Sequence, residues 1–340
     1  ETIKKSGVRV MTRTTAFGLY DHGTAGLLER VTDHLSNPSS AAPRQRFWTV
    51  RSKHTILATG ALERNFVFGN NDMPGIMTAA SAKAYLYRFG ILPGKKIIIS
   101  TNNNSAYEVS FALANAGASV NLLDARATLP SELSNAAKEY GVDVRKSTAA
   151  LKAYGAKSVS RLEIATLNEK TWAQGGSEEC DLVLISGGWS PIINLLSHRG
   201  SRPTWDDKIN CFMPGSCKEP IELAGAAIGI WDLSKCEVSG EAVASAVAKA
   251  LGETIPEIKG QKSNGWTDQI KPLYEVRIPG KKQKGFVDPQ HDVTAADIRL
   301  AHQEGFISVE HLKRYTTLGM ATDQGKMGNV IGIALMAEAL

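Results

Sequence analysis

Two groups of small residues in this sequence are suited to hold a nucleotide cofactor. Ala58-Thr59-Gly60 ends one predicted strand, and Ala224–Gly229 ends another before an alanine-rich helix. Small residues at a strand end let the backbone approach a dinucleotide, and a helix start adds N–H donors and a positive dipole end. The two groups predict one dinucleotide held between two distant turns. Close packing of helix on strand is the alternative interpretation.

A strand–helix–strand unit over Lys95–Asp124 has the order of a second dinucleotide-binding unit without its phosphate loop. Asp124 ends the second strand, where a ribose-binding carboxylate is expected, but the turn Thr101–Ala106 contains no glycine. Glycine is what lets the backbone approach a pyrophosphate. We therefore expect this module to have lost ordinary dinucleotide binding, with its asparagines building turns or capping the helix. No G-x-G-x-x-G occurs in the sequence, so the loop for the first site is expected upstream of Glu1.

No catalytic or metal-binding constellation is evident. The seven histidines are isolated, and the sequence has no HExxH motif, P-loop or Ser/His/Asp order. The four cysteines lack zinc-ligand spacing and are expected to be free thiols in a reducing cytosol. We predict no catalytic residue and no metal site in this chain, and a cytoplasmic location.

Composition places the chain among multidomain α/β proteins. Its 340 residues are 43% hydrophobic and 21% charged, with 31 glycines, which suits two or three domains with many tight turns. The net charge of +5 is spread along the chain, so nucleic-acid binding is not supported. No apolar run reaches the roughly 18 residues of a membrane span. The sequence starts with Glu and stops inside an apolar helical pattern, so we expect a piece of a longer chain.

Hydrophobic periodicity predicts alternating strands and helices. Strands are expected at Gly7–Thr14 with its continuation Thr15–Tyr20, Phe47–Lys53, His54–Gly60, Lys95–Ser100, Ser119–Asp124, Val142–Lys146, Leu162–Asn168, Cys180–Ser186 and the start of Ile221–Gly229. Helices are expected at Thr78–Phe89, Ser105–Ala116, Ser131–Tyr140, Glu241–Leu251, Thr294–Gly305, Ser308–Leu318 and Val330–Leu340.

Four stretches of the sequence resemble the alpha subunit of heterotetrameric sarcosine oxidase. They are ATGALERNFVFGNNDMPGIMTAASAKAYLYRFGILPGKK (58–96), TNNNSAY (101–107), CDLVLISGGWSPIINLLSH (180–198) and SVEHLKRYTTLGMATDQGK (308–326). The resemblance covers nearly the whole chain, and the glycine-less TNNNSAY turn makes it specific. It implies the middle part of a longer subunit, with a glycine-rich loop upstream and a folate-binding, aminomethyltransferase-like domain downstream.

The resemblance also implies an α/β fold of two Rossmann-like, glutathione-reductase-like domains, the second inserted in the first, plus a small C-terminal helical domain. The implied domains are 1–70 and 191–255 for the first dinucleotide-binding domain, 71–190 for the inserted domain, 256–284 for a linker and 285–340 for the helical domain. The last resembles the iron–sulfur domain of related amine and opine dehydrogenase subunits. The positions matching its cluster cysteines are Asp288, Gln290, Asp323 and Gly328; none is a thiolate, so no cluster is expected.

The family demethylates sarcosine oxidatively to glycine with hydrogen peroxide and passes the one-carbon unit to tetrahydrofolate. The resemblance implies NAD in this chain, FAD and FMN in the beta subunit, tetrahydrofolate on the downstream domain, and beta, gamma and delta partner subunits. It also implies an oxidoreductase acting on the CH–NH group of donors, with this piece inactive alone. By position, the residues resembling the NAD contacts are Ala16, Ala58, Gly60, Ala226, Trp231 and Leu233.

Two other functions stay open at this point. One is an FAD-dependent amine or opine dehydrogenase subunit, and the other is a non-catalytic scaffold subunit of the oxidase. The segment Thr316–Lys326 is rich in Thr, Gly and Lys, which predicts a binding site for a phosphate group or for the edge of a flavin.

Overall fold

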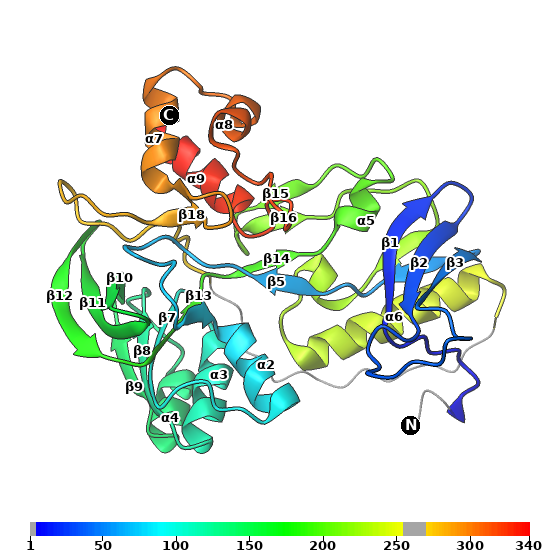
Figure 1. Cartoon of the computed structure of the whole chain (residues 1–340), viewed down its shortest axis with the longest axis horizontal. Helices are drawn as coiled ribbons and strands as arrows, with labels where there is room; N and C mark the ends of the chain where they lie inside the picture. The colour runs from blue at the N-terminus through cyan, green and yellow to red at the C-terminus, as the bar shows by residue number, and fades with distance from the viewer. Residues whose placement is uncertain (1–4, 254–269) are drawn as a thin grey trace. The chain divides into compact units, whose positions relative to one another are not determined.

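The computed structural model describes residues 5–253 and 270–340, and the chain divides into two compact units (Figure 1). The first unit joins Glu1–Ala61, Pro191–Asp206 and Phe212–Gly265. The second joins Leu62–Ser190, Asp207–Cys211 and Trp266–Leu340, so in chain order it is inserted in the first. Of the expected linker 256–284, residues 256–269 lie outside the described residues.

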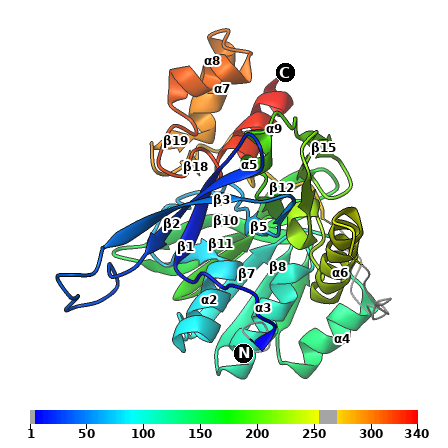
Figure 2. The same cartoon turned by 90° about the vertical axis from the view of Figure 1, so that its right-hand side faces the viewer.

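The second unit is built on a five-stranded parallel sheet with strand order β6-β13-β7-β8-β9. The strands are β6 (Ile76–Thr78), β7 (Lys96–Thr101), β8 (Ser119–Asp124), β9 (Asp143–Lys146) and β13 (Leu182–Ser186). Helices α2 (Ala79–Phe89), α3 (Ser105–Asn115) and α4 (Ser131–Glu139) lie along one face of this sheet (Figures 1 and 2). An antiparallel sheet of β10 (Thr148–Gly155), β11 (Val159–Asn168) and β12 (Thr171–Glu179) covers the other face.

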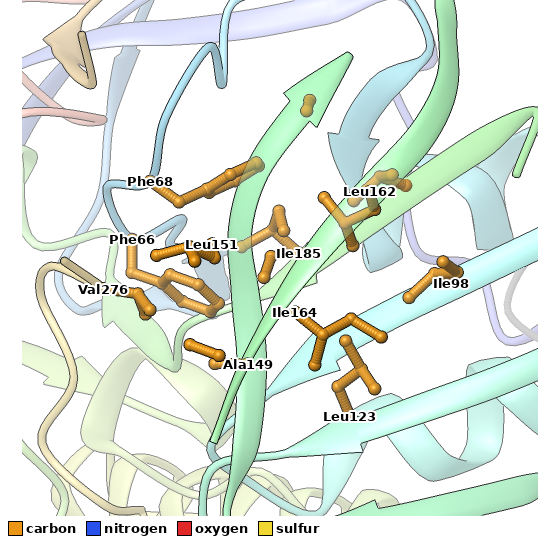
Figure 3. Close-up of a cluster of buried hydrophobic side chains, with 14 of the residues drawn as sticks. Phe66, Phe68, Ile98, Leu123, Ala149, Leu151, Leu162, Ile164, Ile185 and Val276 are labelled. Carbon is orange, nitrogen blue, oxygen red and sulfur yellow. The ribbon is translucent and has the colours of Figure 1, made fainter. Parts of the chain in front are cut away.

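Alternation along the central strands divides the core of this unit into two layers. Ile97 and Ile99 of β7 belong to the cluster formed with the helices, whereas Ile98 between them belongs to the cluster formed with β10 and β11. Figure 3 shows the second cluster, in which Phe66 and Phe68 pack with side chains from the sheets. Because both faces are covered, the central strands are continuously apolar, as buried parallel strands are.

Local sequence sets the ends of the helices that cover the sheet. The Thr78 side chain accepts a hydrogen bond from the Ser81 amide at the start of α2, and Gly90 ends the helix with φ of 66°. Glycine reaches this left-handed conformation without the steric cost that a Cβ brings. The predicted helix Thr78–Phe89 is therefore confirmed, with Thr78 as its cap.

The C-terminal part of the second unit is helical, as expected. It contains α7 (Ala295–Gln303), α8 (Val309–Thr316) and α9 (Asn329–Ala339), with the short strands β18 (Phe286–Asp288) and β19 (Val293–Thr294) before them. Thr294 and Asp297 form a capping box at the start of α7. Ile298, Leu312 and Leu335, one from each helix, meet in one buried cluster.

The first unit contains short strands and one long helix. Its elements are β1 (Thr14–Tyr20), β2 (Thr24–Arg30), β3 (Gln45–Arg51), β4 (Thr55–Leu57), α5 (Asn194–Ser197), β15 (Thr204–Asp206), β17 (Ile221–Leu223), the 3-10 turn η1 (Gly225–Ile228) and α6 (Leu233–Ala250). β1, β2 and β3 form an antiparallel sheet, and β4 pairs with β17. The strands β5 (Ala61–Glu63), β14 (Trp189–Pro191) and β16 (Cys211–Met213) lie where the chain passes between the segments of the two units.

The predicted strand Gly7–Thr14 is wrong, because the first strand begins only at Thr14. Arg13 has φ of 53°, which interrupts an extended chain, and the side chains of Val8 and Val10 are exposed. Alternation specifies a strand only where one face is buried, and this segment buries neither valine. The continuation Thr15–Tyr20 is a strand, as predicted.

The sequence pattern also missed elements. β2, β10 and β12 were not predicted, and the helix expected at Glu241–Leu251 begins at Leu233. Asp232 caps that earlier start, since its side chain accepts a hydrogen bond from the Lys235 amide at 2.9 Å. No helix in the two described stretches is both long and apolar enough to cross a bilayer.

Candidate dinucleotide site

The parallel pairing of β4 with β17 brings the two small-residue turns of the first unit together. Thr55 lies opposite Ile221 and Leu57 opposite Leu223. The Ala224 amide extends the ladder by donating to the Leu57 carbonyl oxygen at 3.1 Å. Because the strands are parallel, the turns that follow them leave the same edge of the sheet. This is the arrangement that the two groups of small residues predicted.

The first turn is held in place by the segment that follows β14. The Thr59 hydroxyl donates to the Ile192 carbonyl oxygen at 2.6 Å, and the Ile192 amide donates to the Gly60 carbonyl oxygen at 2.9 Å. Gly60 has φ of 77°, and a Cβ built on it meets no atom within 4 Å. Glycine is therefore required here for its backbone conformation, and the space beside it is open.

The second turn is tied to α6. Gly225 and Gly229 have φ of 67° and 75°, and the Gly225 amide donates to the Ser239 hydroxyl at 3.2 Å. The Ile230 amide donates back to the Gly225 carbonyl oxygen at 3.4 Å, which closes the turn. Two left-handed glycines thus reverse the chain between β17 and the start of α6.

Five of the six predicted contact residues lie in these two turns or shortly after the second one. Ala58 is exposed directly after β4, and Gly60 lies two residues on. Ala226 is half-buried in η1, Trp231 precedes the helix cap, and Leu233 is the first residue of α6, with 75% of its side chain exposed. Their role as cofactor contacts stays a prediction.

Ala16 lies on a different sheet. It is exposed on β1, where the pairing with β2 shifts register between Ala16 and Gly18. Leu19 of the same strand packs in one cluster with Leu57 of β4. The two sheets are therefore neighbours, although Ala16 itself is not brought to the edge where Ala58 lies by any strand pairing.

The residues at the β4–β17 edge fit a dinucleotide. Three glycines with positive φ surround two adjacent strand ends, so the backbone can approach a ligand where side chains would obstruct it. The start of α6 adds the positive end of a helix dipole nearby. This chain's own part would be to bind and orient the nucleotide through backbone amides.

The corresponding turn of the second unit is filled by its own side chains. Asn102, Asn103 and Asn104 are all buried, at 0–5% exposed. The Asn103 amide group donates to the Ser186 carbonyl oxygen at 3.1 Å, and its side-chain oxygen accepts from the Ser105 amide at 3.0 Å. Asn103 therefore accepts a hydrogen bond from the first amide of α3, where a phosphate accepts backbone amides in an ordinary dinucleotide-binding unit.

The carboxylate expected to bind ribose is also occupied. Asp124 is fully buried and forms a salt bridge with Arg126, with 2.7 Å between Nη2 and Oδ2. The Tyr107 hydroxyl donates to the same carboxylate at 2.9 Å. Burial and the charge of Asp124 raise the pKa of Tyr107, so its hydroxyl stays a donor. These contacts support the prediction that the module has lost ordinary dinucleotide binding.

Comparison with known proteins gives the same fold. A family model described as pyridine nucleotide-disulphide oxidoreductase matches residues 2–211, and the sarcosine oxidase A3 domain model matches residues 282–340. The chain belongs to the pyridine nucleotide-disulphide oxidoreductase family.

Individual relatives confirm the resemblance to sarcosine oxidase alpha subunits. "Sarcosine oxidase subunit alpha" of Rhizobium meliloti (strain 1021) is 39% identical over 98% of this chain and 33% of its own length. The protein of the same name from Corynebacterium sp. (strain P-1) is 35% identical over 96% of this chain and 35% of its own length. The chain thus spans about a third of these relatives.

A solved structure confirms the fold alone. L-proline dehydrogenase from P. horikoshii superimposes with a TM-score of 0.62 at 19% identity, over 94% of this chain and 58% of its own. With the two family models, it establishes two Rossmann-like domains, the second inserted in the first, and a small helical C-terminal part.

In the helical part, the positions matched to cluster cysteines hold groups that do not suit iron–sulfur binding. The Asp288 carboxylate accepts hydrogen bonds from the amides of Gln290 and Gly319 at 3.0 and 3.1 Å. Asp323 likewise accepts from the amides of Gly325 and Met327 at 3.2 and 2.9 Å. Both carboxylates therefore accept hydrogen bonds from backbone amides of their own loops. An iron–sulfur cluster requires thiolate ligands, which these positions lack. The residues present do not fit a cluster.

Sequence reasoning missed two charged residues of the second unit, Glu63 and Arg64, which follow the first turn in the sequence. Glu63 ends β5 and accepts a hydrogen bond from the Ala80 amide at 2.6 Å, in the first turn of α2. Burial raises the pKa of Glu63 to about 7, although hydrogen bonds from Ser186 and Ala80 act in the opposite direction. The neighbouring Arg64 is only 3% exposed. The only signal was their place between two apolar stretches, which does not reveal burial.

We expect Gly60→Ala to lower the free energy of unfolding by about 1–2 kcal/mol, because an L-residue is strained at φ of 77°. The matched control is Gly240→Ala within α6, where a Cβ also meets nothing within 4 Å. There the change should stabilise by about 0.5–1 kcal/mol, because glycine is unfavourable in a helix. Urea unfolding followed by circular dichroism measures both; equal effects would contradict the assigned backbone conformation.

We expect Arg126→Met to destabilise the protein by about 3–5 kcal/mol, because it leaves the buried Asp124 carboxylate without its charge partner. The control is Lys83→Met, which removes an exposed pair with Glu108 and should cost at most about 1 kcal/mol. The same urea titration applies. A similar small loss in both variants would show that Asp124 is not buried as a charged pair.

Glu63 predicts a pH dependence of stability. Its pKa is raised in the folded chain from 4.5 to about 7, so folding favours the protonated acid. Stability from this group is therefore present at low pH and lost as the pH rises between those two values. Glu63→Gln should be more stable than the parent near neutral pH and similar to it near pH ~5. Thermal unfolding across that range measures this, with the exposed Glu108→Gln as control; parallel curves for parent and Glu63→Gln would refute it.

Proposed function

We propose that this chain is the nucleotide-binding portion of a sarcosine oxidase alpha subunit, and that it holds NAD at the β4–β17 edge of the first unit. The observation that carries the proposal is the parallel pairing that brings Ala58–Gly60 beside Ala224–Gly229. The similarity to two proteins named sarcosine oxidase subunit alpha supports the choice of enzyme. Under this proposal the bound nucleotide is contacted by Ala16, Ala58, Gly60, Ala226, Trp231 and Leu233.

The chain's contribution to the reaction is binding and positioning. No cluster of three or more His, Cys, Asp or Glu side chains that could hold a metal occurs within residues 5–253 and 270–340. The described part of the first unit supplies glycine turns and backbone donors at the proposed site. Following the resemblance to sarcosine oxidase, we place the oxidation of the CH–NH bond on FAD and FMN of a beta subunit, which would supply the hydride chemistry.

The full proposal is a cytoplasmic complex with beta, gamma and delta subunits. It demethylates sarcosine to glycine with formation of hydrogen peroxide and passes the one-carbon unit to tetrahydrofolate on a downstream domain. The domains are proposed as 1–70 with 191–255, 71–190 without a dinucleotide, and 285–340 without a cluster. The filled Asn102–Asn104 turn and the engaged Asp288 carboxylate support the last two assignments.

The test is cofactor retention. The complete gene product that contains this chain is purified, incubated in turn with NAD and FAD, and passed through gel filtration. We expect NAD, released by acid and measured enzymatically, to remain at about one per chain, with no flavin absorbance. Gly60→Ala should weaken retention, and Gly240→Ala should leave it unchanged. A yellow protein that excludes NAD would contradict the proposal and favour an FAD-dependent dehydrogenase subunit.

The reaction is tested with the partner chains present. Coexpression with the genes beside this one should give a complex that forms hydrogen peroxide only when sarcosine is added. Failure to form peroxide with sarcosine or any other N-methyl amine would refute the proposed activity, whatever the result for NAD.

A further inference from the structure

Arg64 is a buried cation without a counter-charge in the second unit. Its side chain is 3% exposed, and neither terminal nitrogen, Nη1 or Nη2, has a hydrogen-bond partner among the residues that the structure describes. An isolated buried charge is strongly unfavourable, and buried arginines are ordinarily paired with a carboxylate or phosphate. The molecule therefore carries a cationic group whose partner is not among the described side chains.

The backbone fixes Arg64 firmly in this position. Its amide donates to the Gly188 carbonyl oxygen at 2.8 Å, and its carbonyl oxygen accepts from the Gly187 amide at 2.7 Å. A Cβ on Gly188 would lie 2.8 Å from Nη2 of Arg64, and Gly188 has φ of 105°. The absence of a side chain at Gly188 is thus what leaves room for the guanidinium. The main chain of Arg64 is therefore fixed by two hydrogen bonds, and its guanidinium lies over Gly188.

The groups near the guanidinium are weak acids and neutral donors. Burial lowers the pKa of Arg64, and the titratable groups acting against this are Cys211 and Tyr274, neither of which is a carboxylic acid. The Tyr274 hydroxyl donates to the side-chain oxygen of Asn210 at 2.6 Å. The Nδ2 amide nitrogen of Asn210 is itself buried without a partner among the described residues. Nδ2 of Asn210 is therefore a second buried donor without a described partner, and its residue is hydrogen-bonded to Tyr274, which interacts electrostatically with Arg64.

We propose that Arg64, assisted by Nδ2 of Asn210, forms a buried anion-binding site that takes one carboxylate or phosphate group. The planar guanidinium offers two parallel N–H donors, which match the two oxygens of either group. The site lies within the second unit and does not involve the β4–β17 edge, so it stands or falls independently of NAD binding. Its ligand would neutralise the one described buried arginine whose terminal nitrogens are both unpaired.

The test is calorimetric titration of the purified protein with inorganic phosphate and with acetate, in a buffer that contains neither. We expect saturable binding of at least one of them: phosphate alone identifies a phosphate site, and acetate alone a carboxylate site. Arg64→Met should abolish the binding. Arg64→Lys keeps the charge but lacks the paired donors, so it should weaken binding by about tenfold. Arg88→Met, at an exposed position of α2, is the control and should bind as the parent does.

Two results would overturn the proposal. One is binding of phosphate or acetate by Arg64→Met with the affinity of the parent protein. The other is no saturable binding of either anion by the parent. A thiolate absorbance that Cys211→Ser removes would then identify Cys211 as the counter-charge. Arg64→Lys keeps the experiment decisive if Arg64→Met fails to fold: a lysine variant that binds phosphate and acetate as tightly as the parent would also contradict a guanidinium site.

Discussion

The pairing of β4 with β17 is the constraint on which the proposed site depends. The two strands are separated in sequence by the whole stretch Leu62–Ser190, and only three residues of each strand pair. Such short strands are stabilised by what they pack against, and Leu57 lies in one buried cluster with Leu195 and Leu196 of the returning segment. Without that pairing, Gly60 and Gly225 would belong to unrelated loops. The two glycines would then not lie at the same edge of a sheet.

The second unit contains a continuous strand–helix–strand unit, β7-α3-β8, whose turn is filled by side chains. In an ordinary dinucleotide-binding unit, the glycine-rich turn leaves backbone amides free to bind a phosphate. Here Asn103 satisfies the Ser105 amide and Arg126 satisfies Asp124. Buried polar groups need hydrogen-bond partners, and in this turn side chains of the protein provide them in place of a ligand. The strand–helix–strand order is kept because the apolar layers on both faces of the sheet require it, whatever the turn binds.

The burial of each element explains whether the sequence predicted it. β7, β8 and β13 were predicted because strands covered on both faces are continuously apolar and end at clear turns. β12 was missed because it is an edge strand rich in polar residues and glycine, and most of its side chains are exposed. The part of α6 from Leu233 to Gly240 was missed because Ser, Cys and Gly interrupt its pattern, although Asp232 gave a capping signal.

The candidate site also has features that the sequence reveals and features that depend on burial. Gly60 and the turn Ala224–Gly229 were recognisable because small residues at a strand end leave a local signature, and the pairing of β4 with β17 brings them together. Their contact with a cofactor stays a prediction. The role of Asp124 could not be seen in sequence, because its partners Tyr107 and Arg126 meet it only when α3 packs on the sheet. Sequence reveals backbone requirements more readily than it reveals which charges become buried.

Arg126 and Arg64 show why the compensation of buried charge is informative. Both are arginines of the second unit, at 5% and 3% exposed, and both therefore lost most of their hydration on folding. Arg126 regains that loss from Asp124 and from the side-chain oxygen of Asn104, at 2.7 and 2.6 Å. Arg64 has no such acceptor among the described residues, yet two backbone hydrogen bonds hold it between Gly187 and Gly188. A fold that pairs one buried arginine so completely has no physical reason to leave the other unpaired, unless its acceptor arrives with something else.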